Sequence, residues 1–180
     1  MTTHDLLVCG PVLALIAMAA AVDWRSRRIP NGVTFTMILS GIAVNVASLG
    51  PTTGAQALLG FLAGFGLMLV LLLLGAIGAG DVKLMAGIGA WMGPEAVLKV
   101  FVLASLVGAV IVLAQAIAQR RGKVLIRNSA VLAMNLAHIG DVGLDHVREA
   151  GQASRSVDRP LPYAVPVLIA MAVLVARSWR

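Results

Sequence analysis

Charged residues are scarce in this sequence. They make up 12% of the 180 residues, whereas 59% are hydrophobic and the mean hydropathy is +0.94. A soluble domain needs more polar surface than this composition supplies, so the sequence predicts a polytopic membrane protein. The net charge of +6 does not indicate nucleic-acid binding, because the basic residues lie at the ends of apolar runs, where they set membrane orientation.

Cysteine is nearly absent as well. Cys9 is the only one, which excludes an internal disulfide and a cysteine-cluster zinc site. A group of four polar residues could be pictured as metal ligands, but they lie in a polar segment without the spacing of a metal site, and we interpret them as solvated loop residues: His138, Asp141, Asp145 and His146. We therefore expect no metal and no cofactor.

The apolar runs predict an all-α fold, a transmembrane helical bundle within one membrane-embedded domain over residues 1–180. About six spans are expected, at residues 6–22, 33–49, 55–77, 82–92, 95–118 and 161–176. Arg25, Arg27 and Arg28 follow the first run, which puts that end in the cytoplasm and both termini outside. Residues 82–92 give only about 17 Å of helix, yet a crossing there keeps the later basic cluster on the cytoplasmic side.

Two further patterns concern packing and the membrane surface. Gly60 and Gly64 form a GxxxG pattern that permits close helix packing, although chance glycines would give the same pattern. Residues 119–160 form the longest polar stretch and are expected to be cytoplasmic. Four apolar residues on one helical face predict an amphipathic helix on the inner leaflet there, namely Leu125, Leu132, Leu136 and Ile139.

Two acids stand apart from the other acidic residues. Asp23 directly follows the first predicted span and Asp81 follows the third, so both are expected at the cytoplasmic end of the bundle. An ionisable group at the edge of the hydrocarbon layer is costly and is a functional candidate. Two neighbouring carboxyl groups share one proton, so the ionised one can activate water while the protonated one polarises an amide carbonyl. This is the chemistry of aspartic proteases.

Structural roles remain open for both acids. Asp81 precedes a predicted helix and could be its N-cap, and Asp23 could form an interfacial ion pair with Arg25. Gly78 and Gly80 flank Asp81; they permit turn conformations closed to other residues and leave room for another chain to approach.

Four features taken together are more specific than the two acids. They are Asp23, Arg28–Asn31 (RIPN), Gly78–Leu84 (GAGDVKL) and Pro162–Pro166 (PYAVP). In this order they resemble the type IV prepilin peptidase family, most closely its short members that serve Flp (Tad) pili. The resemblance covers nearly every predicted span; residues 119–160 are its least recognisable part.

This resemblance implies a bacterial inner-membrane aspartic endopeptidase that removes the short basic leader of a prepilin at the cytoplasmic face. It implies an Flp-type prepilin, the lipid bilayer and the pilus assembly machinery as partners, and no nucleic acid. It carries over Asp23 and Asp81 as the catalytic pair and Gly78 and Gly80 as residues that shape the loop around Asp81. The supporting residues it implies are Lys83, Arg28, Pro30 and Asn31.

One departure from the family concerns a second activity. Longer members carry a cytoplasmic insertion with paired CxxC motifs and also methylate the new N-terminus of the pilin. This sequence has no such insertion and one cysteine, so we expect no N-methyltransferase activity.

The sequence offers less support for other functions. Serine and zinc intramembrane proteases need GxSx and HExxH elements, and presenilin-like peptidases pair GxGD with Tyr-Asp and Pro-Ala-Leu elements; none occurs in that form. A small ion- or proton-coupled transporter that uses Asp23 and Asp81 is the main alternative, although the apolar runs hold few polar residues besides Asn45 and Gln115. A structural membrane subunit ranks third.

Overall fold

The computed structural model describes residues 3–49, 51–137, 143, 149 and 162–178, and the regular structure in this part of the chain is helical. The helices are α1 (Thr3–Ser26), α2 (Asn31–Leu49), α3 (Pro51–Leu73), α4 (Ala79–Ala118), α5 (Gly122–Ala137) and α7 (Ala164–Ser178). The predicted all-α class is confirmed. Three segments are long and apolar enough to cross a membrane: Cys9–Ser26, Thr53–Leu73 and Ala79–Ala118.

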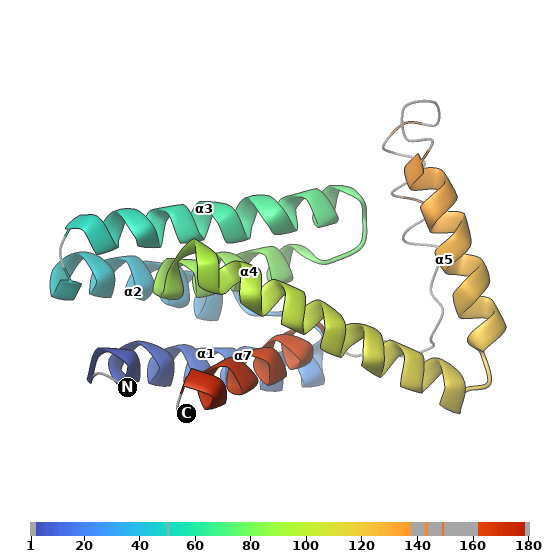
Figure 1. Cartoon of the computed structure of the whole chain (residues 1–180), viewed down its shortest axis with the longest axis horizontal. Helices are drawn as coiled ribbons and strands as arrows, with labels where there is room; N and C mark the ends of the chain where they lie inside the picture. The colour runs from blue at the N-terminus through green and yellow to red at the C-terminus, as the bar shows by residue number, and fades with distance from the viewer. Residues whose placement is uncertain (1–2, 50, 138–142, 144–148, 150–161, 179–180) are drawn as a thin grey trace.

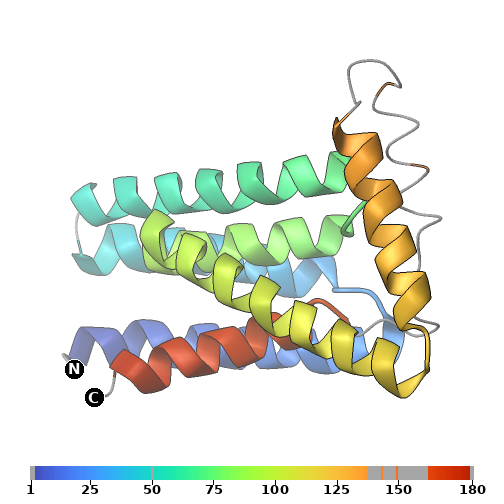
Figure 2. The same ribbon diagram turned by 45° about the vertical axis from the view of Figure 1, so that its right-hand side comes forward.

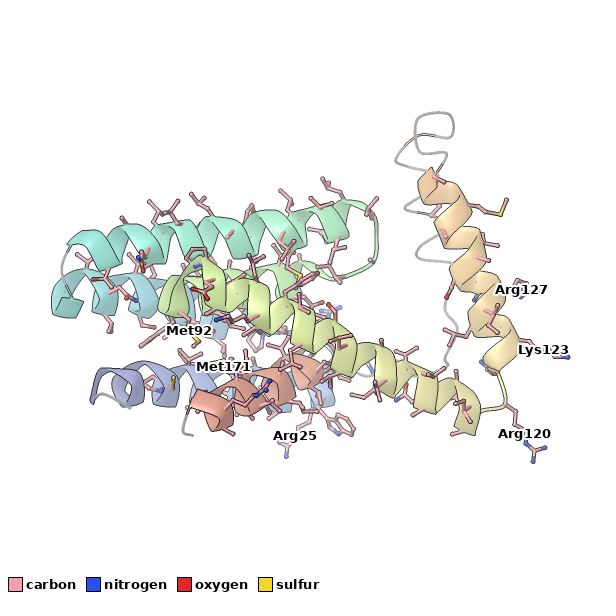
Figure 3. All side chains as sticks on the ribbon, in the orientation of Figure 1. Arg25, Met92, Arg120, Lys123, Arg127 and Met171 are labelled. Atoms are coloured by element: carbon pink, nitrogen blue, oxygen red, sulfur yellow. The ribbon has the colours of Figure 1, made fainter. Side chains whose placement is uncertain are left out.

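The helices form a bundle around α4. Helices α2 and α3 lie on one side of it, and α1 and α7 lie side by side on the other (Figure 1, Figure 2). Helix α5 runs across one end of this bundle rather than along it, as an interfacial helix would. Three basic side chains just before α5 and in its first turns point away from the bundle, as Figure 3 shows: Arg120, Lys123 and Arg127.

Helix α4 changes direction at Gly93, whose backbone is non-helical (φ 81°, ψ 177°) and which precedes Pro94. The first half of α4 lies beside α3, and the second half returns across the bundle (Figure 1). Residues 84–91, in the first half, are all buried. This explains how so short a helix fits in the bundle, because protein rather than lipid surrounds it.

The first half of α4 approaches α3 closely at the two GxxxG glycines, Gly60 and Gly64. A Cβ on Gly64 would lie 2.6 Å from the carbonyl oxygen of Met85, and a Cβ on Gly60 would collide with the backbone of Gly89. The contact is between backbones, which cannot move aside as a side chain can. These glycines therefore have a packing role, and chance does not account for them.

Helix α2 is tied to α4 by buried polar side chains. The Asn45 amide donates to the carbonyl oxygens of Ala90 and Trp91 at 3.2 and 3.3 Å, and also to that of Gly41 in its own helix. The indole of Trp91 donates back to the Met37 carbonyl at 2.8 Å. Asn45, read as a sparse polar residue in the sequence, is thus a structural link.

Both ends of α3 differ from those of the predicted span, residues 55–77. Its start lies at Pro51, because proline suits the first turn of a helix, where an N–H would have no partner. Its end lies at Leu73, because Gly75 adopts a left-handed conformation (φ 73°) and the N–H groups of Gly75 and Ala76 bond to the carbonyls of Leu72 and Leu71. Residues 51–54 therefore belong to the helix.

Part of the predicted surface helix cannot be compared with the structure. Helix α5 covers the expected region, with Leu125 half-buried in it. The side chains of Leu132 and Leu136 lie outside the described part of the chain, as does Ile139. The four polar residues weighed as metal ligands lie outside it as well, namely His138, Asp141, Asp145 and His146.

Candidate active site

Asp23 is placed by the last turns of α1. It does not follow the helix, as predicted, but lies within it, three residues before Ser26. Its side chain is 7% exposed, and its carboxylate accepts a hydrogen bond from the backbone N–H of Ala164, the first residue of α7. The N–H groups at a helix start have no partner within the helix. Asp23 therefore joins the end of α1 to the start of α7.

The chain reverses direction after Ser26, where α1 ends. Arg27 takes a left-handed conformation (φ 52°), and its N–H donates to the Asp23 carbonyl at 2.8 Å. Helix α2 then begins at Asn31, directly after Pro30. The Arg28 side chain is exposed, and the Arg28 carbonyl accepts a hydrogen bond from the Ser26 hydroxyl at 3.2 Å. This short connector keeps the end of α1 near the start of α2.

Asp81 is placed by the first turn of α4. The helix begins at Ala79 with Gly78 as its N-cap, and the Gly78 N–H donates to Asp81 Oδ2 at 3.0 Å. Asp81 is therefore not the N-cap, but it lies in the first turn and helps to cap the helix. Because this bond uses Oδ2, it fixes the carboxyl group and leaves Oδ1 for other partners.

The reason for the two glycines near Asp81 differs from the expected one. Gly78 has φ −90° and ψ 158°, a conformation open to most residues, and positive φ in this region belongs to Gly75 instead. Gly80 matters because of space: a Cβ there would lie 3.1 Å from the Cβ of Ile29, in the connector after Asp23. The expectation of a special backbone at Gly78 and Gly80 is wrong. At Gly80 the close neighbour is Ile29 of the same chain, and room there for another chain stays a prediction.

The two acids come together at one end of the bundle. The end of α1, the start of α4 and the start of α7 all lie there (Figure 1, Figure 2), and Asp81 is close enough to Asp23 for their charges to interact. The guanidinium that acts on Asp23 is that of Arg27 rather than of Arg25. Two carboxyl groups so placed can divide the roles of proton acceptor and proton donor between them.

A sequence comparison identifies the family. Residues 11–113 match the family model that describes the type IV leader peptidase family. This chain belongs to the type IV leader peptidase family. Asp23 and Asp81 both lie in the matched stretch, as do the connector and α3.

Curated relatives carry the name prepilin leader peptidase/N-methyltransferase. The Burkholderia pseudomallei protein is 36% identical over 109 residues, which is 57% of this chain and 35% of the relative. The Klebsiella pneumoniae protein is 33% identical over 101 residues, 52% of this chain and 44% of the relative. The Dickeya chrysanthemi protein is 36% identical over 110 residues, which is 57% of this chain and 37% of the relative. The chain thus spans less than half the length of these relatives. No solved structure matches it.

Within this leader peptidase family member, a side-chain hydrogen bond links the RIPN segment to the GAGDVKL segment. Lys83 Nζ donates to Asn31 Oδ1 at 2.8 Å. The resemblance of the motifs to the prepilin peptidases implied both as supporting residues, but the pairing could not be read from the sequence, because 52 positions separate them.

Tyr163 is a site residue that sequence reasoning missed. The PYAVP segment was noted, but Tyr163 received no role. In the structure it lies close enough to Asp81 for an electrostatic interaction, and its hydroxyl is buried without a hydrogen bond of ordinary geometry among the described residues. Ser105, on the returning half of α4, is its neighbour. No pattern in the sequence marked Tyr163, because its place beside Asp81 depends on the packing of α7 against α4.

Proposed function

We propose that this chain is an intramembrane aspartic endopeptidase that cleaves the leader from a prepilin, with Asp23 and Asp81 as the catalytic pair. The observation that carries the proposal is the meeting of two acids from helices distant in sequence, one buried at the end of α1 and the other fixed in the first turn of α4. Membership of the leader peptidase family and the names of its curated relatives support it.

The hydrolysis needs no group beyond the dyad and a water molecule. The ionised carboxylate takes a proton from water, and the resulting hydroxide adds to the carbonyl carbon of the peptide bond. The protonated carboxyl group donates its proton to the carbonyl oxygen, which gives a tetrahedral diol. When the diol collapses, the C–N bond breaks, the leaving nitrogen takes up a proton from the protonated carboxyl group, and one diol hydroxyl gives its proton to the ionised carboxylate. The products are a carboxylic acid and a new amino terminus.

The hydrogen bonds at the site fit these roles. Ala164 N–H holds Asp23, and Gly78 N–H holds Oδ2 of Asp81, so neither carboxyl group rotates freely. A catalytic group held in one orientation needs no reorganisation during the reaction. We assign Gly78 and Gly80 to the positioning of Asp81, with Arg28, Pro30, Asn31 and Lys83 as supporting residues.

The proposal includes a membrane orientation. Arg25 and the exposed basic residues around α5 gather at the same end of the molecule as the dyad (Figure 3). Basic residues favour the cytoplasmic side, so we assign this end to the cytoplasm and both termini to the outside of the bacterial inner membrane. A precursor with a short basic leader followed by an apolar helix would bring its cleavage site to this depth. We assign an Flp-type prepilin as substrate, with the pilus assembly machinery downstream.

We further propose that the chain lacks N-methyltransferase activity, since the sequence holds one cysteine and no paired CxxC motifs. Mass spectrometry of the processed pilin is expected to give an unmodified N-terminus. A mature N-terminus heavier by one methyl group, formed with this chain as the sole processing protein, would contradict the assignment.

The transporter alternative has less support. A proton or ion path needs polar groups free to exchange partners at mid-membrane, and Asn45 is committed to the carbonyl oxygens of Gly41, Ala90 and Trp91. The expected result of a transport assay in proteoliposomes is no flux that depends on Asp81.

The test of the dyad is precursor processing in membranes. Asp23→Asn and Asp81→Asn should each lower cleavage of an Flp-type prepilin by more than about 100-fold, because each removes one of the two proton-transfer roles. Glu95→Gln is the matched control. It removes an acid that lies just after the bend of α4 at Gly93, away from the start of that helix, where Glu95 is exposed and paired with Lys99. Normal processing by either aspartate variant, with equal amounts of inserted protein, would refute the proposal.

A further inference from the structure

The Lys83–Asn31 hydrogen bond joins the two segments that carry the acids. Asn31 is the first residue of α2 and directly follows the connector, residues 27–30, which begins at the end of the helix that carries Asp23. Lys83 lies two residues after Asp81 in the first turns of α4. The bond at 2.8 Å is charge-assisted, because an ammonium donates to a neutral amide oxygen.

The direction of Lys83 argues against a direct chemical role. Residues two apart on an α-helix point about 200° apart around its axis, so Lys83 and Asp81 lie on opposite sides of the first turns. Asp81 faces Asp23 and Tyr163, while Lys83 faces the start of α2. Lys83 therefore acts on the position of the helix start rather than on the reacting atoms.

The separation of the two acids depends on how the helices that carry them are held together. Helix α1 packs less extensively on α4 than α2, α3 and α7 do. The position of Asp23 relative to Asp81 thus depends on the start of α7, through the Ala164 N–H, and on the connector. At the connector, Ile29 lies against Gly80 and Asn31 is bonded to Lys83.

We propose that Lys83 and Asn31 are positioning residues that clamp the connector to the start of α4 and so fix the separation of Asp23 and Asp81. This inference rests on the proposed peptidase function. It adds two residues, Lys83 and Asn31, that take no direct part in the hydrolysis of the peptide bond. The clamp acts as a unit, so removing either partner abolishes the whole effect.

The first test measures processing rates at equal protein abundance. Lys83→Met removes the donor and keeps most of the aliphatic stem, and Asn31→Leu removes the acceptor and keeps the branched shape of the side chain. Each is expected to lower the rate about 10-fold, and the double variant is expected to be no slower than the slower single one, because both break one bond. Asn31→Asp keeps an acceptor and should restore at least half of the rate. The control Lys99→Met, in the exposed Glu95 pair, should leave the rate unchanged.

Two results of this test would overturn the clamp. One is a double variant whose loss equals the product of the two single losses, because independent roles multiply. The other is a wild-type rate in Lys83→Met.

A second test does not depend on activity. In a Cys9→Ser background, Asp23→Cys and Asp81→Cys together allow crosslinking with a short bifunctional thiol reagent. Adding Lys83→Met should lower the crosslinking yield about 3-fold or more, because the start of α4 is no longer held, whereas adding Lys99→Met should not. An unchanged yield with Lys83→Met would overturn the clamp even if processing fell. If the chain processed no prepilin at all, the proposed function would fail, and the crosslinking result would still decide the clamp.

Discussion

Replacing Gly80 by alanine tests how tightly the connector must approach the start of α4. The added Cβ would lie 3.1 Å from Ile29 Cβ and 3.4 Å from Ile29 Cγ1. Carbon atoms in contact prefer at least about 3.5 Å, so the approach is about 0.4 Å too close. Because the nearest atom is the Ile29 Cβ, whose position is set by the backbone and not by side-chain rotation, the connector backbone must move.

The expected size of the effect follows from this displacement. A shift of 1 Å in a catalytic group costs about 100-fold in rate. If the loss in activation free energy scales with distance, a shift of about 0.4 Å costs about 6-fold. Alanine is also a better helix former than glycine, so Gly80→Ala should not lower the amount of folded protein. The loss should therefore appear in the rate of prepilin processing and not in protein abundance.

Gly78→Ala is the matched control for this prediction. Gly78 has a φ of −90°, which alanine accepts, and the nearest atom to its added Cβ is Asp81 Oδ2 at 3.5 Å, an ordinary contact. Its processing rate should stay within about 2-fold of wild type, since the capping N–H is retained. Time courses of precursor shortening in membranes, normalised to enzyme abundance, measure both variants. A fully active Gly80→Ala beside an inactive Gly78→Ala would refute the reasoning.

Three further predictions concern the free energy of unfolding, measured in detergent micelles. Gly64→Ala should lower it by about 1–3 kcal/mol, because the new Cβ would lie 2.6 Å from the Met85 carbonyl oxygen. Gly66→Ala, which has open space around it, should raise it by up to about 1 kcal/mol. Equal stability of the two variants would be inconsistent with backbone contact at Gly64. Asn45→Leu should lose about 1 kcal/mol for its two interhelical hydrogen bonds, and a more stable variant would contradict this. Tyr163→Phe should keep the unfolding free energy or raise it by about 1 kcal/mol, because the buried hydroxyl lacks a bond of ordinary geometry; a clear loss would mean that the hydroxyl is paired.

Several features of the fold could be read from the sequence because they depend on composition and periodicity. The apolar runs predicted helices near their observed places, since a segment that must satisfy its backbone within lipid becomes a helix. The amphipathic segment was expected around Leu125, and α5 lies there. The helix ends were less accurate, as at Pro51 and Leu73, because they depend on a few local hydrogen bonds that hydropathy does not report.

The candidate site divides in the same way. Asp23 and Asp81 could be singled out because a carboxylate at the end of an apolar run is costly and therefore rare. Tyr163 could not, because a tyrosine near a helix start carries no such signal, and its relation to Asp81 exists only once α7 packs beside α4. The reason for Gly80 also came from packing, since the atoms it makes room for belong to Ile29.

The sequence by itself thus determined an all-α membrane protein, the two acids and the motifs around them, because burial cost and helix periodicity act on neighbouring residues. Only the tertiary structure decided that Ala164 N–H binds Asp23, that Lys83 binds Asn31 and that Gly64 meets the Met85 backbone. These contacts join segments far apart in the chain. Which distant atoms meet is set by the packing of whole helices, and no local pattern records it.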